Sequence, residues 1–113
     1  MYGLPKDFDG NVLVGRVLEM VCFNENQVYL HFDRKTTITI EVAFSYGSDQ
    51  VIEIPVKESN LMESLGASVT EAHGDEHGTL SLLFDNGQTL KVYDPSKQYE
   101  SYTISYEGKV IIV

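Results

Sequence analysis

The sequence predicts a mainly β domain, built from two tandem three-stranded antiparallel units with one short helix between them. Three observations support this fold class. Apolar and polar residues alternate over several short segments, as they do in strands. The pattern recurs after 52 residues, and turn-forming residues separate the segments. The units, about residues 12–56 and 64–113, are expected to form one domain, either as a sandwich or as a strongly curved sheet.

A constant offset of 52 residues relates the first half of the chain to the second. The matched pairs are Val17 and Val69, Glu19 and Glu71, Val28 and Leu80, Leu30 and Leu82, Phe32 and Phe84, Asp33 and Asp85, Thr37 and Thr89, Ile38 and Leu90, and Ile40 and Val92. One offset serves three successive segments, and the apolar matches keep a period of two. This pattern predicts a structural duplication, with Phe32 and Phe84 buried in equivalent places.

Each unit is expected to contain three strands. They span residues 12–23, 28–32 and 37–44 in the first unit, and 67–73, 80–84 and 89–93 in the second. The strongest turn signal is Asn86-Gly87, because both residues tolerate positive φ. Residues 12–23 are apolar on both faces of the expected strand, which favours a long, bent strand at the centre of a sheet.

The segment between the units is expected to hold a fourth strand at residues 51–54, which Pro55 would end. A short helix follows, with Ser59 or Asn60 as its cap and Gly66 as its end. After the second unit, residues 102–106 and 109–113 are predicted to form a last hairpin.

The charge is negative and unevenly placed. The net charge is −9, and nine acids with a single base, Lys57, lie between residues 36 and 90. Nucleic-acid phosphates and anionic lipid headgroups would be repelled, so binding to nucleic acid or to membranes is disfavoured. An acidic surface either keeps a protein soluble or docks a basic partner, and the sequence leaves both explanations open.

The compartment is expected to be the cytoplasm. The chain starts without a basic region followed by an apolar one, as a signal peptide would have. The only cysteine, Cys22, lies in an apolar stretch, which is typical of a small buried residue. No disulfide, metal or other cofactor is therefore expected.

The second half resembles a family of small uncharacterised bacterial β-domain proteins. The resemblance rests on the hairpin TLSLLFDNGQTL, which fits the pattern L-x-L-x-F-x-(D/N)-G-x-x-L, and on the segment YESYTI that follows it. The first half, LVGRVLEMVCFNENQVYLHF, is similar to the opening of the same domain. The resemblance implies the fold and carries no reaction. Small acidic domains of this kind also occur among immunity proteins of bacterial toxin systems, which is an analogy.

Three groups of residues are candidates for a site. His73 and His77, with His31, are the most metal-like set, but two of them flank a glycine-rich turn and the first unit has no counterpart. Glu19 and Glu71 could meet across the axis of the repeat and act as an acid and base pair. The tyrosines of the last segment either pack on the sheet or form a protein-binding surface; they are Tyr93, Tyr99, Tyr102 and Tyr106.

The sequence favours a non-catalytic protein-binding module, in concrete form an immunity protein that neutralises a basic toxin. No catalytic triad order, P-loop or dinucleotide fingerprint is found. The predicted partner-binding residues are Glu41, Asp49, Glu53, Glu71, Asp75, Glu76, Asp85, Tyr99 and Tyr102. Two alternatives stay open. One is a small metal-dependent hydrolase that uses His73, Asp75, His77 and Glu71; the other is a structural or ligand-binding domain that dimerises through an open sheet edge.

Overall fold

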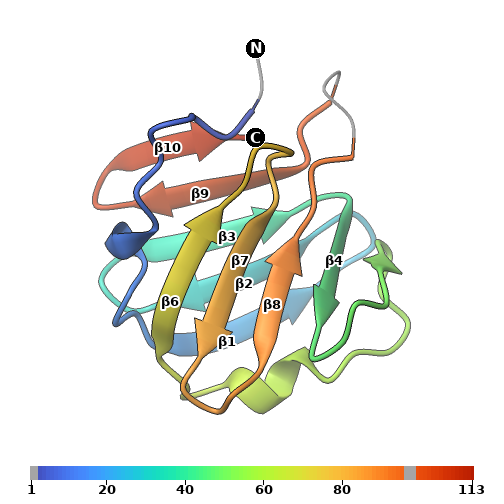
Figure 1. Cartoon of the computed structure of the whole chain (residues 1–113). Coiled ribbons are helices and arrows are strands. Elements are labelled where there is room, and N and C mark those ends of the chain that lie inside the picture. Colours follow the sequence, from blue (N-terminus) through green and yellow to red (C-terminus); the bar gives the residue numbers. More distant parts are fainter. Residues whose placement is uncertain (1–2, 96–98) are drawn as a thin grey trace.

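The computed structural model describes residues 3–95 and 99–113, and these form two five-stranded antiparallel sheets. The first sheet has the strand order β1 (Leu18–Phe23), β2 (Val28–Phe32), β3 (Thr36–Ile40), β9 (Tyr102–Tyr106) and β10 (Lys109–Ile112). The second has the order β5 (Ile52–Glu53), β4 (Ala43–Tyr46), β8 (Thr89–Val92), β7 (Leu80–Phe84) and β6 (Val69–Gly74). The sheets lie face to face with their strands crossing steeply (Figure 1), and they do not close into a barrel. The predicted mainly β fold is confirmed.

Each unit gives its fourth strand to the other unit's sheet. Strands β1, β2 and β3 form a meander in the first sheet, but β4 then pairs with β8 in the second. Likewise β6, β7 and β8 form a meander in the second sheet, while β9 pairs with β3 in the first. The strand predicted at residues 37–44 is therefore wrong as a single element. The chain bends at Glu41 and Val42 between β3 and β4.

The strand register of the first unit recurs in the second, with one change in the first strand. Leu30 pairs with Ile38, and Leu82 pairs with Leu90, so β2 and β3 match β7 and β8 at an offset of 52. In the first strands, however, Leu18 and Val69 occupy the same place, opposite Phe32 and Phe84, which is an offset of 51. The turn before β7 is one residue longer than the turn before β2 (residues 75–79 against 24–27). The predicted matches of Val17 with Val69 and of Glu19 with Glu71 are therefore wrong, because Leu18 is the equivalent of Val69 and Met20 is the equivalent of Glu71.

A pseudo-two-fold axis passes through the pair formed by Val17 and Ser68. These residues form an isolated antiparallel bridge, and since 17 plus 51 is 68, each is the other's equivalent. Asp33 Oδ1 accepts a hydrogen bond from the Val17 amide at 3.0 Å, and Asp85 Oδ1 accepts one from the Ser68 amide at 3.2 Å. The two aspartate amides donate to the Val17 and Ser68 carbonyls in return. The repeated aspartate therefore ties its turn to the axis in both units.

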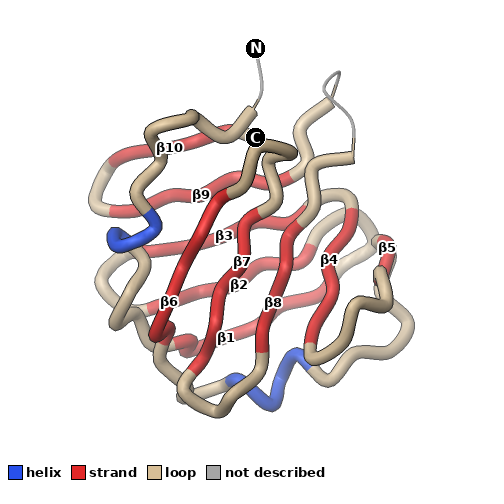
Figure 2. The backbone as a smooth tube through the Cα atoms, viewed as in Figure 1, coloured by secondary structure: helices blue, strands red, loops and turns tan. Residues whose placement is uncertain are grey.

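The segments before each meander are helical turns. Residues 10–12 form the 3₁₀ turn η1 (Gly10–Val12), and β1 begins only at Leu18 as an edge strand, so the predicted long central strand is wrong. The predicted short helix is the 3₁₀ turn η2 (Leu61–Ser64), blue in Figure 2 together with η1. Ser59 Oγ accepts from the Leu61 amide at 3.0 Å, so Ser59 is the cap.

The core lies between the sheets and takes equivalent residues from both units. Phe32 and Phe84 are 5% and 1% exposed at the ends of β2 and β7. Phe44 and Tyr102 also correspond, since they pair with the equivalent residues Val92 and Ile40, and both are fully buried. Burial of aromatic and branched side chains from both sheets provides the main stabilisation of such a sandwich.

Candidate functional site

Acidic residues from three segments meet around the start of β9. Asp94 Oδ1 accepts a hydrogen bond from Ser101 Oγ at 2.7 Å, and the Glu41 amide donates to the Ser101 carbonyl at 2.9 Å. Glu100 directly precedes Ser101. The Tyr102 hydroxyl donates to the Gly78 carbonyl at 2.6 Å and so fixes the β6–β7 turn, which carries Asp75, beside this segment. We call Glu41, Asp75, Asp94 and Glu100 the acidic corner, in which Asp94 is itself buried at 8% exposure.

Tyr102 is the buried support of this corner. Its side chain is fully buried. Burial raises the pKa of its hydroxyl well above the ordinary value, and the carboxylates of Asp94 and Asp75 raise this pKa further. A residue with no exposed surface cannot contact a partner, so the prediction of Tyr102 as a partner-binding residue is wrong. The sequence does contain a signal for this burial, because Tyr102 lies two residues before the apolar Ile104 in β9 and therefore on the same face of the strand.

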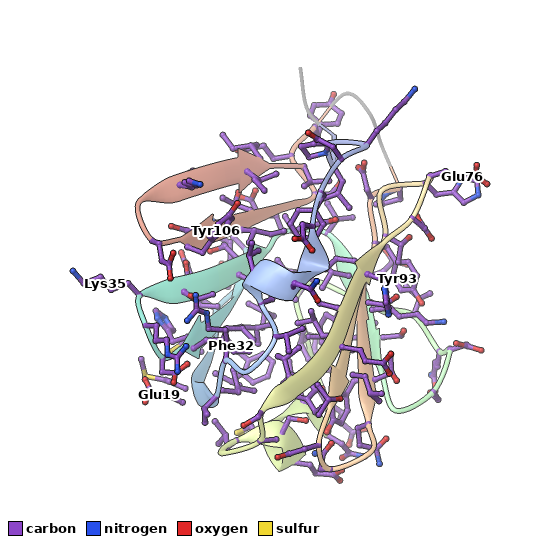
Figure 3. All side chains as sticks on the ribbon, turned by 60° about the vertical axis from the view of Figure 1, so that its left-hand side comes forward. Glu19, Phe32, Lys35, Glu76, Tyr93 and Tyr106 are labelled. Carbon is purple, nitrogen blue, oxygen red and sulfur yellow. The ribbon has the colours of Figure 1, made fainter. Side chains whose placement is uncertain are left out.

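Two exposed side chains stand beside the acidic corner. Tyr99 is 69% exposed and lies just before Glu100. Glu76 projects from the tip of the β6–β7 turn (Figure 3). Asp75 Oδ1 accepts from the amides of His77 and Thr79 at 2.8 and 2.9 Å, which holds this turn in one conformation. A cleft of about 360 Å³ separates the turn from the segment that contains Leu4 and Phe8.

The other predicted acids do not join the corner. Asp85 follows β7, whereas Asp75 and Glu76 precede it, so Asp85 lies at the opposite end of the second sheet. Asp49 lies in the β4–β5 loop, where its carboxylate is 3.3 Å from Lys91 Nζ. Glu71 lies on β6 beside His73, at 3.7 Å, and Glu53 lies on the edge strand β5. The predicted acidic residues therefore surround the second sheet rather than share one face.

The predicted histidine set is dispersed. His73 is on the outside of the second sheet, His77 is in the turn beside Glu76, and His31 is on β2 in the other sheet. Within residues 3–95 and 99–113, no group of three His, Cys, Asp or Glu side chains could hold a metal ion.

The paired carboxylates are also apart. Val17 and Ser68 are antiparallel, so the chain leads Glu19 and Glu71 away from the axis in opposite directions. The backbone of Leu18, next to Glu19, pairs with Ala67 and Gly66: the Leu18 amide donates to the Ala67 carbonyl, and the Gly66 amide donates to the Leu18 carbonyl.

A polar network at the other end of the second sheet was not expected from the sequence. Tyr46 and Ser64 share a buried hydrogen bond of 2.6 Å between their hydroxyls, and Asn86 Nδ2 donates to Ser64 Oγ at 3.1 Å. These groups tie η2 to β4 and to the β7–β8 turn. The sequence signal for the burial of Tyr46 is its position two residues after the apolar Phe44, on the same face of β4.

Comparison with known protein families shows which family the chain belongs to. A family of unknown function, DUF6188, matches residues 10–113. The chain belongs to this family. The DUF6188 match begins at η1 and includes both units, the axis and the acidic corner. No curated protein and no solved structure matches the chain. None of the helical turns in the described part of this DUF6188 protein has the length and apolar character needed to cross a membrane.

Proposed function

We propose that this DUF6188 domain is a non-catalytic protein-binding module that neutralises a basic protein by covering the basic protein's active site, in the manner of a bacterial immunity protein. The observation that carries the proposal is the acidic corner, where three segments that carry acidic residues are held together by hydrogen bonds beside the exposed Tyr99. In this proposal both proteins meet in the cytoplasm. The β-sandwich serves as the rigid support of the corner.

The corner has the properties of a preorganised docking site. Its three segments are joined by the bond from the Glu41 amide to the Ser101 carbonyl and by the bond from the Tyr102 hydroxyl to the Gly78 carbonyl, so little conformational entropy is lost when a partner binds. The negative field attracts a basic surface and raises the association rate. Tyrosine is enriched among the residues that contribute most binding energy, and Tyr99 presents its ring to solvent.

The test begins with the immobilised domain and a lysate of the native host, followed by kinetics with the purified captured protein. Glu100→Lys in the corner, combined with Glu76→Lys beside it, changes the charge by four, and Glu58→Lys with Glu63→Lys gives the same change near η2. We expect the corner variant to slow association about tenfold or more at low salt and the η2 variant to have a small effect, because nearby charges act mainly on association.

Tyr99→Ala separates contact from attraction. We expect it to raise the dissociation rate about 30-fold, which corresponds to about 2 kcal/mol, and to leave association nearly unchanged. Equal slowing by the two double variants would mean that only total charge matters and would contradict the acidic corner. A captured protein that is acidic, or whose association is independent of salt, would reject the proposed function.

A further inference from the structure

The outer face of the first sheet carries no aspartate, glutamate, lysine or arginine along its two cross-strand rows. Strand pairing aligns one row as Met20, His31, Thr37, Ser105 and Val110. The same pairing aligns the second row as Cys22, Tyr29, Thr39, Thr103 and Ile112. The side chains at the two edges are the most exposed: Met20 is 48%, Val110 60% and Ile112 41% exposed. A five-strand face without charge is unexpected in a chain of net charge −9.

The two rows are chemically alike, position by position. On β1 they place Met20 beside Cys22, and on β10 they place Val110 beside Ile112, so both edges of the face are apolar. The middle strands carry hydroxyl and ring groups in both rows: His31 and Tyr29 on β2, Thr37 and Thr39 on β3, and Ser105 and Thr103 on β9.

The two ends of this face carry opposite charges. The β2–β3 turn and the start of β10 bring Arg34, Lys35 and Lys109 to one end. Lys35 projects outward there (Figure 3), and the same end holds Arg16 and the acids Glu19, Asp33 and Glu107, which makes four bases against three acids. The opposite end has Glu25 in the β1–β2 turn, Glu41 after β3 and Glu100 before β9.

We infer that this uncharged face binds a second copy of the chain. A two-fold axis that lies in the interface, perpendicular to the strands, places each row of one copy on the other row of its partner. Thr37 then meets Thr39, and Val110 meets Ile112, so apolar edges meet apolar edges and hydroxyls meet hydroxyls. The same rotation places the basic end of one copy over the acidic end of the other. This is the self-complementarity that an isologous dimer requires.

The area of the face sets the strength of the dimer. With strands about 4.8 Å apart and about 3.4 Å per residue, five strands of about six residues give about 400 Å² per copy. Stable dimers bury about 800 Å² per partner. The dimer is therefore reversible, with a dissociation constant in the micromolar range or weaker, and it forms at high protein concentration. Glu41 and Glu100 belong both to the acidic corner and to the acidic end of this face, so a basic partner and a second copy compete for these charges.

The first test measures molar mass by analytical ultracentrifugation from about 5 µM to about 1 mM, a range that brackets such a constant. We expect the mass to rise from one chain to two. Thr37→Lys should lower association at least tenfold, because it puts like charges next to the axis. Thr89→Lys is the matched control, since Thr89 occupies the equivalent place on the second sheet. Val110→Lys, at an exposed position, replaces Thr37→Lys if a thermal melt shows that the latter is unfolded.

The second test exchanges charges between the ends. Lys35→Glu and Glu25→Lys should each weaken association several-fold, and the double variant should recover it, because both ends are then reversed together. A mass of one chain at every concentration would overturn the inference. So would an equal loss of dimer in Thr37→Lys and Thr89→Lys, or a double charge variant that is weaker than both single variants.

Discussion

The two units have similar apolar inner residues but different outer faces. On the inside, Phe32 and Phe84, or Leu30 and Leu82, occupy equivalent places and are all buried. On the outside, the equivalent pairs are unlike: Met20 and Glu71, Cys22 and His73, Tyr29 and Ser81, His31 and Leu83, and Thr39 and Lys91. The shared core restricts the inner positions in both units, because each fills part of the same close-packed space. The outer positions lack this restriction, and the two sheets have acquired different surfaces.

The largest expected effect comes from the shared inner positions. Phe32→Ala and Phe84→Ala should each lower the free energy of unfolding by about 3–5 kcal/mol, because each leaves a cavity in the one core. Urea denaturation of both variants measures the loss. The outer-face variant Thr89→Lys serves as the control, with a change within about 0.5 kcal/mol. A loss at one phenylalanine that is less than half the loss at the other would contradict their equivalence.

The sequence predicted the meanders because each strand has one buried and one outer face. It did not predict the corner between β3 and β4, for a physical reason. Ile40 in the first sheet and Phe44 in the second face the same core, so the alternation of apolar residues continues across the bend. The shift of register in β6 was equally hidden, because it depends on one extra residue in a turn. The pairing of Val17 with Ser68 at the axis leaves no pattern in the sequence.

The axis offers the second comparison. Asp33→Ala and Asp85→Ala should each lower the free energy of unfolding by about 1.5–3 kcal/mol, since each removes a hydrogen bond that a backbone amide donates to a carboxylate. The loss should be larger for Asp33→Ala, because Asp33 is half-buried; Asp85 is exposed, so water can replace its carboxylate as the hydrogen-bond acceptor. Urea denaturation gives both values, and Asp49→Ala is the control for removing an acid outside the axis. Losses no greater than that of Asp49→Ala would show that the two aspartates do not stabilise the axis.

The candidate site was predictable only in part. Asp75, Glu76 and Tyr99 were recognisable because turns and acidic segments are exposed in most folds. The gathering of Asp94 and Glu100 with them depends on β9 crossing to the other sheet, which the sequence did not predict. The uncharged face was also missed, because its rows join residues from five strands that are far apart in the chain.

The smallest effect distinguishes Tyr102 from its equivalent, Phe44. Tyr102→Phe makes the two positions identical and removes the hydrogen bond to the Gly78 carbonyl, so we expect a loss of about 0.5–1.5 kcal/mol at neutral pH. The pKa of the Tyr102 hydroxyl is raised in the folded protein, chiefly by burial, so the native state holds this proton more tightly than the unfolded chain. The stability that Tyr102 contributes is therefore complete below about pH 10, where an unfolded tyrosine is still protonated, and is lost as the pH rises above it.

The alkaline dependence provides the sharper measurement. Above about pH 10, the original protein should lose up to about 1.4 kcal/mol per pH unit more than Tyr102→Phe, because the variant lacks the hydroxyl whose pKa is raised in the folded state. The other tyrosines are present in both proteins, so their contributions cancel in the difference. Urea denaturation at about pH 8 and at about pH 11 gives the two slopes. Equal slopes would mean that Tyr102 ionises as easily in the fold as outside it, and would remove its role as the buried support of the acidic corner.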